Sequence, residues 1–453
     1  MDIVIAGCGK IGRTIIASLT SEGHSVTAID TNPRALEIVS DLYDIITVEG
    51  NSADSDTLIE AGADKAELFI AMTGSDEINM LSCFFAKKMG ASNTVARIRN
   101  LEYNDQSLDF IRQHIQLEMA INPERLAARE LYHMLKLPSA VNVESFSRRN
   151  FDIAELRLKD NSLLCGMRLM DMRKKYPGQY LVGIVKRNDT VFIPDGNFVL
   201  AANDKIGITA SPAELLKLLR ALSVTQKQAK SVLIVGAGKT TFYLAKLLLQ
   251  GTTKVTIVER DLDRCRELSE SLSGNVNIIH GDGADLDLLL EAGLENMDAF
   301  VSLTGMDEEN ILLAYSASTK NIQKVIAKVN RDEFSLVAEK MGLDTILTPR
   351  KIIADIFVGY ARALKNSLGS KIETLYKLMG GAAEALEFEA SNDPRYVRIP
   401  LKALQLKSNT LVAGIIRGRK TIIPMGDDFI LPGDKVVILT AGKQMNDLSD
   451  IVK

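Results

Sequence analysis

Apolar and polar positions alternate along the chain in a pattern that returns in its second half. In the first half, short apolar runs alternate with stretches of helical spacing. Short strands separated by helices are typical of βαβ units that build a parallel sheet. The apolar runs predict strands over residues 2–7, 25–30, 44–49, 68–73, 94–98 and 119–122.

The pattern changes within each half, where short strands separated by Gly, Pro and Asn-Asp turns follow. A helical stretch such as residues 213–222 closes this segment. We predict an α/β protein with two Rossmann-like parallel-sheet domains, each followed by a small α+β domain. The predicted parallel-sheet domains are 1–136 and 230–368, the α+β domains are 137–225 and 369–453, and residues 226–230 are the predicted linker.

An amphipathic helix is predicted between the two modules of each half. Asn122-Pro123 and Thr348-Pro349 place a capping side chain before a proline suited to the first helical turn. The second helix carries a wide apolar stripe of Ile352, Ile353, Ile356, Phe357, Tyr360, Ala361 and Leu364. The stripe packs either on its own domain alone or on a neighbouring domain as well, and its width favours the second alternative.

The two halves are copies of one another. Residues 49–79 align with 280–310 without a gap, 94–100 align with 325–331, and 120–128 align with 346–354. In the α+β modules, residues 181–196 resemble 411–426 after one small register shift. The offset is about 230 residues throughout, so the chain is a tandem duplication.

A glycine turn follows the first predicted strand. Gly7, Gly9 and Gly12 have the spacing of a dinucleotide-binding turn, and the second strand ends in Asp30. In such a unit the first glycine allows the tight turn, the second lets the backbone approach a pyrophosphate, and the third lets helix and strand pack together. The acid accepts hydrogen bonds from a ribose diol. The sequence therefore predicts a nucleotide site in the first copy.

The second copy has the same unit in an altered form. Gly236, Gly238 and Glu259 repeat the glycines and the acid at the same spacing, but Thr241 stands where the third glycine belongs. The stretch GAGKTT looks like the phosphate loop of an NTPase, yet that motif requires a glycine where Leu233 stands. We interpret it as a second dinucleotide turn, widened or distorted by Thr241, and we predict two unequal sites.

Further polar residues recur at the strand ends of both copies. Asn51 and Asp282 follow the third strand, where a short side chain can bind an adenine or ribose edge. Thr73-Gly74 and Thr304-Gly305 follow the fourth strand, near the glycine turn. Arg97 and Lys328 end the fifth strand, where a cation can reach phosphate oxygens. Together these residues indicate a binding site used for sensing.

Catalytic signatures are missing from the sequence. An oxidoreductase would need an acid or base beside the nicotinamide and a domain for its substrate. The histidines, His24, His114, His133 and His280, lie in no recognisable catalytic motif, and the α+β modules contain none. We therefore predict no catalytic residue, although a nicotinamide-dependent dehydrogenase and a free-standing nucleotide-sensing scaffold remain alternatives.

Composition and charge narrow the expected partners. The chain of 453 residues has a net charge of −4, no Trp and 5% aromatic residues, which argues against a nucleic-acid partner. The sequence has no run of about 18 apolar residues, so we expect no membrane-spanning segment. It has no signal-peptide pattern at its start, so we expect no signal peptide. The four cysteines show no ligand spacing, so we expect reduced thiols and no metal site. Cys8 is expected to be a small residue that fits the turn rather than an oxidation sensor.

These motifs resemble the RCK family, also called KTN, whose TrkA-N and TrkA-C domains regulate potassium transport. The resemblance is carried by GCGKIG (7–12), Asp30, residues 50–79, VARI (95–98) and the modules at 181–196 and 411–426, and it covers nearly the whole chain. It implies a cytosolic regulatory subunit, peripheral on the inner face of the cell membrane through its partner. That partner would be a membrane potassium channel or transporter of the TrkH/TrkG class. A ring of Rossmann-like domains would assemble beneath it, and the oligomer that we expect is a homotetramer.

The resemblance also implies a ligand and its binding residues. Family members are controlled by bound NAD(H) and, in some cases, by ATP or ADP. Carried over by position, the first site is Gly7, Cys8, Gly9, Lys10, Ile11, Gly12, Asp30, Asn51, Thr73, Gly74 and Arg97. The second site is Gly236, Ala237, Gly238, Lys239, Thr240, Glu259, Asp282, Thr304, Gly305 and Lys328. Asp30 and Glu259 suit the ribose of NAD, NADH, ATP and ADP alike.

Overall fold

The computed structural model describes residues 1–100, 103, 105–136, 140, 142–146, 151–224, 228–320, 322–365, 372–442 and 444–453. The predicted linker begins outside these residues, at 226 and 227, and the predicted domain boundaries at 137, 225 and 368–369 also lie outside them. The chain forms two compact units. One contains Met1–Ala128 with Thr348–Ala361, and the other contains Arg129–Leu347 with Arg362–Lys453.

The first unit is built on a six-stranded parallel sheet. Its strand order is β3 (Ile46–Glu49), β2 (Ser25–Asp30), β1 (Asp2–Ala6), β4 (Leu68–Ala71), β5 (Thr94–Arg97) and β6 (Met119–Ile121). The connecting helices are α1 (Lys10–Ser21), α2 (Pro33–Leu42), α3 (Ser55–Glu60), α4 (Asp76–Met89) and α5 (Asp105–Ile115). From β1 the chain builds the sheet outward to one side through β2 and β3, and then crosses to the other side of β1 to add β4, β5 and β6. Ligands of such sheets bind at the carboxyl ends of the strands, beside this switch point between β1 and β4.

The second unit contains a sheet of the same topology. Its strand order is β14 (Val276–His280), β13 (Lys254–Glu259), β12 (Ser231–Val235), β15 (Ala299–Ser302), β16 (Lys324–Lys328) and β17 (Ile346–Leu347). The connecting helices are α9 (Lys239–Leu249), α10 (Leu262–Ser271), α11 (Leu286–Glu291), α12 (Asp307–Ser318) and α13 (Asp332–Lys340). The duplication read from the sequence is therefore a duplication of folds.

The same unit also contains both α+β modules, which have antiparallel five-stranded sheets. One consists of β10 (Thr190–Phe192), β9 (Tyr180–Arg187), β11 (Lys205–Ala210), β8 (Phe151–Arg157) and β7 (Asn142–Phe146), with α7 (Leu169–Lys175) and α8 (Pro212–Ala221). The other consists of β18 (Ile372–Leu378), β19 (Ala383–Glu389), β22 (Lys435–Ala441), β20 (Thr410–Arg417) and β21 (Lys420–Ile422). The two sheets share one hydrophobic core, in which Phe146 and Phe151 pack with Leu439 and Val437. The predicted fold class is confirmed.

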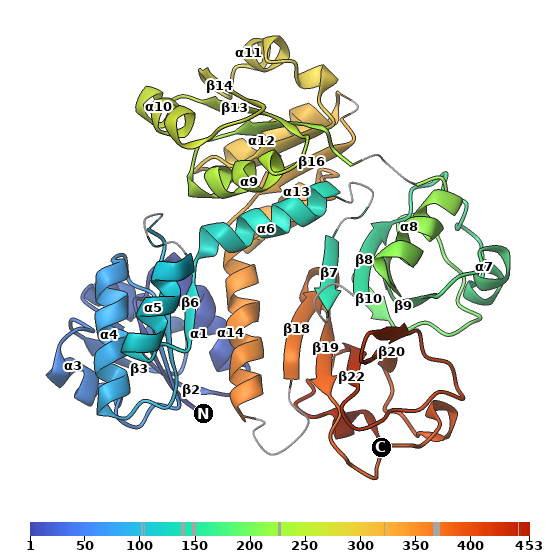
Figure 1. The fold of residues 1–453 in the computed structure, drawn as a ribbon, viewed down its shortest axis with the longest axis horizontal. Coiled ribbons are helices and arrows are strands. Elements are labelled where there is room, and N and C mark those ends of the chain that lie inside the picture. Colours follow the sequence, from blue (N-terminus) through green and yellow to red (C-terminus); the bar gives the residue numbers. More distant parts are fainter. Residues whose placement is uncertain are drawn as a thin grey trace. The chain divides into compact units, whose positions relative to one another are not determined.

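Two long helices follow the parallel sheets, α6 (Pro123–Lys136) and α14 (Pro349–Lys365). The Asn122 side chain accepts a hydrogen bond from the Arg125 N–H at 2.9 Å, which caps α6 as predicted. Residues 348–361, at the start of α14, belong to the compact unit of Met1–Ala128, and Figure 1 shows this orange helix beside the blue domain. Ile353, Phe357 and Ala361 of its apolar stripe are fully buried. Most of the stripe thus lies in one compact unit with the first domain, and Leu364 lies in the other unit, which favours the alternative that the stripe packs on more than its own domain.

Candidate functional site

The first glycine turn is pressed against the end of β4. Gly7 has a φ of +100°, and a Cβ added there would lie 2.7–2.8 Å from backbone atoms of Met72 and Thr73. A Cβ added at Gly12 would lie 1.9 Å from the carbonyl oxygen of Gly7. Both positions require glycine for the fold itself, because a side chain would separate the turn from the sheet or from helix α1.

Gly9 differs from its two neighbours. Its backbone is extended, with φ −66° and ψ −174°, and an added Cβ would meet no atom within 4 Å. Gly9 is the N-cap residue of α1, and no side chain caps this helix end. The start of the helix therefore presents backbone N–H groups and its positive dipole end beside open space, an arrangement that suits an anion.

The strand-end acid is tied directly to this turn. One carboxylate oxygen of Asp30 accepts a hydrogen bond from the Cys8 N–H at 2.6 Å, and the other accepts one from the Asn32 N–H at 2.8 Å. Asp30 is half-buried, and each of its oxygens has lone-pair capacity left for a ribose hydroxyl. Asp30 and Cys8, both predicted residues of the first site, are thus in contact.

The loop after β4 brings the remaining first-site residues close. Thr73 lies against Gly7, and an Nη atom of Arg97 lies 3.4 Å from the Thr73 carbonyl oxygen. Gly74 follows, exposed and with open space around an added Cβ.

Asn51 is exposed at the end of β3, where its side chain accepts a hydrogen bond from the Ala53 N–H at 3.0 Å. The neighbouring Gly50 N–H donates to the Asp30 carbonyl oxygen at 3.1 Å, so this strand end borders the carboxylate. Lys10 and Ile11 begin α1.

The second copy has the same geometry. Gly236 has a φ of +100° and lies against Leu303 and Thr304, while Gly238 has an extended backbone and open space around an added Cβ. The Ala237 N–H donates to a Glu259 carboxylate oxygen at 2.6 Å. Lys328 Nζ lies 3.3 Å from the Leu303 carbonyl oxygen. Asp282 is exposed after β14, Gly305 follows Thr304, and Lys239 and Thr240 begin α9.

The predicted distortion of the second turn is wrong. Thr241 is fully buried, and its hydroxyl donates a 2.6 Å hydrogen bond to the carbonyl oxygen of Gly236. The torsions of Gly236 and Gly238 stay close to those of Gly7 and Gly9. The threonine is accommodated because its hydroxyl satisfies the carbonyl against which a methyl or methylene group would press.

One pair of residues at these sites went unnoticed in the sequence. Asn79 is fully buried in α4, where its side-chain oxygen accepts the Thr73 N–H at 2.8 Å and its amide donates to the Arg97 carbonyl oxygen at 3.0 Å. Asn310 makes the same two contacts, to the Thr304 N–H at 2.8 Å and the Lys328 carbonyl oxygen at 2.9 Å. The signal was an asparagine that ends both aligned stretches, 49–79 and 280–310, on a helix face that should be apolar.

Cys8 behaves as a packed thiol. It is fully buried, and burial raises its pKa to about 12, with the Asp30 charge adding to the rise. A thiol that stays protonated is a poor nucleophile. The interpretation of Cys8 as a small residue that fits the turn is the better supported one.

The described residues contain neither a membrane-spanning helix nor a cluster suited to a metal ion. No helix there combines the length and the apolar character needed to cross a membrane. No group of three or more His, Cys, Asp or Glu side chains in the same part of the chain is placed to hold a metal ion.

Family models match both halves of the chain. The TrkA-N domain matches residues 3–123 and 232–349, and the TrkA-C domain matches 153–223 and 385–453. A Trk system potassium uptake protein TrkA homolog of Archaeoglobus fulgidus is 32% identical over 456 residues, covering all of both chains. The Trk system potassium uptake protein TrkA of Haemophilus influenzae is 28% identical, covering 98% of this chain and 96% of its own.

Solved structures agree on the fold. The GsuK RCK domain has a TM-score of 0.63 at 15% identity, covering 97% of this chain and 92% of its own. The GsuK channel bound to NAD has a TM-score of 0.64 at 15% identity, covering 97% of this chain and 77% of its own. With tandem TrkA-N and TrkA-C domains and relatives aligned over its whole length, this chain belongs to the TrkA family of Trk-system potassium uptake proteins.

Proposed function

We propose that this chain is the nucleotide-binding regulatory subunit of a Trk-type potassium uptake system. It acts at the cytoplasmic face of the cell membrane, forms a homotetrameric ring, and controls a channel or transporter of the TrkH/TrkG class. Its ligands are NAD(H) and ATP or ADP. The family membership supports this role, and the related fold of GsuK has been solved bound to NAD and bound to ADP.

One observation carries the nucleotide part of the proposal. Four glycines with surroundings described have no positive φ and would meet no atom within 4 Å with an added Cβ: Gly9, Gly74, Gly238 and Gly305. All four belong to the two candidate sites. Since neither torsion nor packing within the chain requires glycine there, the space beside them is available to a ligand that approaches the backbone closely.

The residues present fit a nucleotide diphosphate group and its ribose. The glycine turns and the starts of α1 and α9 would hold the phosphates, and Asp30 and Glu259 would hold the ribose diols. Asn79 and Asn310 fix the loops beside which the ligand lies. Such a ligand would bridge the turn, the loop after the fourth strand and the end of the third strand.

Control of the transporter follows from differential affinity. A ligand that binds one arrangement of the ring more tightly shifts the ring toward it, by about 1.4 kcal/mol for each tenfold ratio of affinities. Since α14 starts in the unit of the first domain and ends in the unit that holds the second copy, it connects the parts that would move.

The test uses Gly9→Asp and Gly238→Asp. Each side chain enters space that the folded chain leaves open, so the thermal midpoint should change little, whereas calorimetric affinity for NADH or ADP at that site should fall at least about tenfold. Gly251→Asp, at an exposed loop position of the second domain where an added Cβ makes only ordinary contact, is the control and should bind normally.

Two results would contradict the proposal. One is unchanged binding of every nucleotide to a variant that carries both Gly9→Asp and Gly238→Asp. The other is a potassium flux of the assembled complex that saturating nucleotide leaves unaltered.

A further inference from the structure

One edge of the first parallel sheet exposes a group of apolar side chains. The edge strand β3 is flanked by α2 and α3, which both pack against it. Leu42 and Ile46 are each 65% exposed, Ile59 is 59% exposed, and Ile38, one helical turn before Leu42, is 39% exposed. A single exposed apolar side chain is ordinary, but several at one edge indicate a surface that a partner covers. We call these four residues the edge patch.

The edge patch lies at the end of the sheet opposite to the candidate nucleotide site. In βαβ units the helices run antiparallel to the strands, so each helix ends near the amino ends of the strands. Leu42 is the last residue of α2, Ile59 is next to the last residue of α3, and Ile46 begins β3. The glycine turn, in contrast, follows the carboxyl end of β1. A partner on the edge patch would therefore leave the nucleotide site open.

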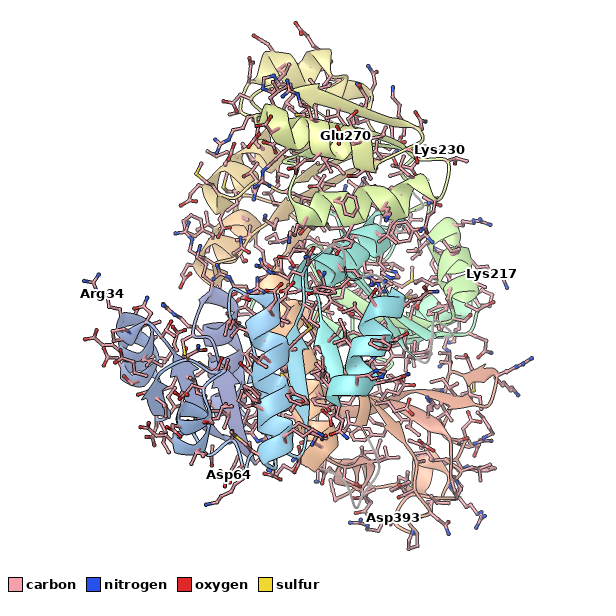
Figure 2. All side chains as sticks on the ribbon, turned by 60° about the vertical axis from the view of Figure 1, so that its left-hand side comes forward. Arg34, Asp64, Lys217, Lys230, Glu270 and Asp393 are labelled. Carbon is pink, nitrogen blue, oxygen red and sulfur yellow. The ribbon has the colours of Figure 1, made fainter. Side chains whose placement is uncertain are left out.

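The surface around the edge patch carries one sign of charge. Residues 35–64 contain no Lys, Arg or His but eight acids, all exposed: Glu37, Asp41, Asp44, Glu49, Asp54, Asp56, Glu60 and Asp64. Among the described residues, none of these eight side chains forms an ion pair. The flanking cations are Arg34 and Lys65, and Figure 2 shows Arg34 and Asp64 at separate ends of this domain. The edge patch is thus an apolar surface in a negative electrostatic field.

The second domain keeps the fold of this edge but not its apolar surface. The positions of Ile38, Leu42 and Ile46 are occupied there by Glu267, Ser271 and Asn277. The position of Ile59 is occupied by Leu290, which is half-buried. The exposed leucines of this region, Leu262 and Leu286, begin α10 and α11, at the other end of the sheet. The edge patch is therefore not a requirement of the fold.

Charge at the second edge is mixed as well. The aligned stretch, residues 264–295, has seven acids but includes Arg264 and Arg266, each paired with a neighbouring aspartate. Glu295, at its end, is paired with Lys320 at 3.3 Å. The combination of exposed apolar side chains and unpaired carboxylates thus belongs to the first domain.

We propose that the edge patch is a docking surface for a segment that combines apolar side chains with Lys and Arg. The occupant is a cytoplasmic loop of the membrane subunit, since cytoplasmic loops of membrane proteins carry an excess of Lys and Arg. Its apolar side chains would cover the edge patch, and its cations would meet the surrounding carboxylates. This inference rests on the proposed function and assigns the contact with the membrane subunit to the first domain.

The charge of this edge disfavours other occupants. Anionic lipid headgroups and nucleic-acid phosphates would be repelled by the carboxylates. A second copy of this chain has a net charge of −4, so it brings no long-range attraction. A basic segment gains from both the apolar area and the opposite charge.

The test measures binding of the full chain to the membrane subunit held in nanodiscs of zwitterionic phosphatidylcholine. The double edge variant, with Asp41→Lys and Leu42→Gln, should bind at least about tenfold more weakly than the wild type. Both side chains are exposed, so its thermal midpoint should change little. The matched control is Glu270→Lys, at the position of Asp41 in the second domain, where Figure 2 labels Glu270. It should change the affinity by less than about twofold.

The single variants separate charge from apolar contact. The affinity of the wild type should fall as salt is raised, because exposed charges are screened. Asp41→Lys should weaken binding mainly at low salt. Leu42→Gln should weaken it by a similar factor at every salt concentration, because it removes apolar area and leaves the charge unchanged.

Nucleotide binding is the internal control for these variants. Because the edge patch lies at the opposite end of the strands, NADH and ADP should bind the double edge variant with wild-type affinity in calorimetry. A wild-type chain that fails to bind the membrane subunit in any nucleotide state would overturn the function on which the inference rests.

Three results would overturn the inference alone. The first is a double edge variant with a normal thermal midpoint that binds the membrane subunit as the wild type does. The second is a changed sedimentation coefficient of this variant with subunit binding intact, which would assign the edge patch to a second copy of the chain. The third is binding of the wild type, lost in the variant, to phosphatidylglycerol nanodiscs without the subunit, which would assign it to lipid.

Discussion

The two Rossmann-like domains keep one backbone frame and fill it with different side chains. In both, the first glycine has a φ of +100°, the strand-end acid accepts a turn N–H at 2.6 Å, and a buried asparagine accepts the N–H of the next loop at 2.8 Å. What differs is the third glycine, the residue after it, and the charges at the strand ends. The frame is what the fold needs, and the exchanged side chains are those a ligand would meet.

The third glycine is the largest structural difference, and Gly12→Thr tests it. In the first domain an added Cβ would lie 1.9 Å from the Gly7 carbonyl oxygen, so α1 must move away from the turn. We expect a loss of at most about 3 kcal/mol, as for other overpacked positions, reduced by whatever the new hydroxyl regains by donating to the Gly7 carbonyl oxygen, as Thr241 does to that of Gly236. Hydrogen exchange of residues 2–21 measures the first domain by itself.

Gly9→Ala is the control for this change, because its Cβ meets no atom within 4 Å. If Gly12→Thr left the hydrogen exchange of α1 at the wild-type level, the glycine turn would accept a threonine in the first domain as it does in the second. The packing of the following helix on its sheet would then play no part in the difference between the domains.

A buried lysine in the second domain is another difference between the two domains. Lys324 begins β16, is 4% exposed, and donates a 2.6 Å hydrogen bond to the Ala140 carbonyl oxygen. Burial lowers its pKa to about 7, although the nearby Asp344, which is paired with Arg157, raises it. The aligned residue of the first domain is Asn93, which does not titrate.

The sign of the pH effect follows from this lowered pKa. Below pH 7 the lysine is charged in both the folded and the unfolded chain, so the full burial penalty applies. Between pH 7 and about 10.5 only the unfolded chain keeps the proton, so stability rises with pH, by up to about 1.4 kcal/mol per unit. Urea unfolding from pH 7 to about 8.5, below the pH at which the cysteines of the unfolded chain ionise, should show this rise, and Lys324→Met should flatten it. An unchanged slope in the variant would contradict the assignment.

The strands of the first sheet, the duplication and the glycine turns could be predicted because they depend on local pattern and spacing. The predicted strand 68–73 ends at Ala71 and the predicted strand 44–49 begins at Ile46, which are ordinary errors at element ends. Two features could not be predicted. Asn79 occupies a buried helix position where the pattern calls for an apolar residue, and Thr241 keeps its turn through a hydroxyl contact. Each depends on a hydrogen-bond partner that only the folded chain brings into reach.

The buried asparagines Asn79 and Asn310, which hold equivalent loops in the two domains, give the last comparison, through Asn79→Ala and Asn310→Ala. Each change leaves a loop N–H and a strand carbonyl without their partner, and we expect about 2 kcal/mol of local destabilisation. The Thr73 hydroxyl lies 2.7 Å from the Asn79 side-chain oxygen and 3.2 Å from the Ser75 carbonyl oxygen, so Asn79 is its closer acceptor, whereas the Thr304 hydroxyl donates to the aligned Met306 carbonyl oxygen at 3.3 Å. The loss should therefore be larger in the first domain, by about 1 kcal/mol.

Hydrogen exchange of residues 68–79 and 299–310 measures the two loops separately in one experiment. Asn79→Asp keeps the acceptor for Thr73 but places a buried carboxylate against the Arg97 carbonyl oxygen, so it should destabilise the loop at least as much as Asn79→Ala. Equal losses in the two domains would mean that the Thr73 hydroxyl adds nothing to the first loop. The frame beneath the two sites would then be equally firm, and the contrast between the domains would lie in the side chains that face the ligand.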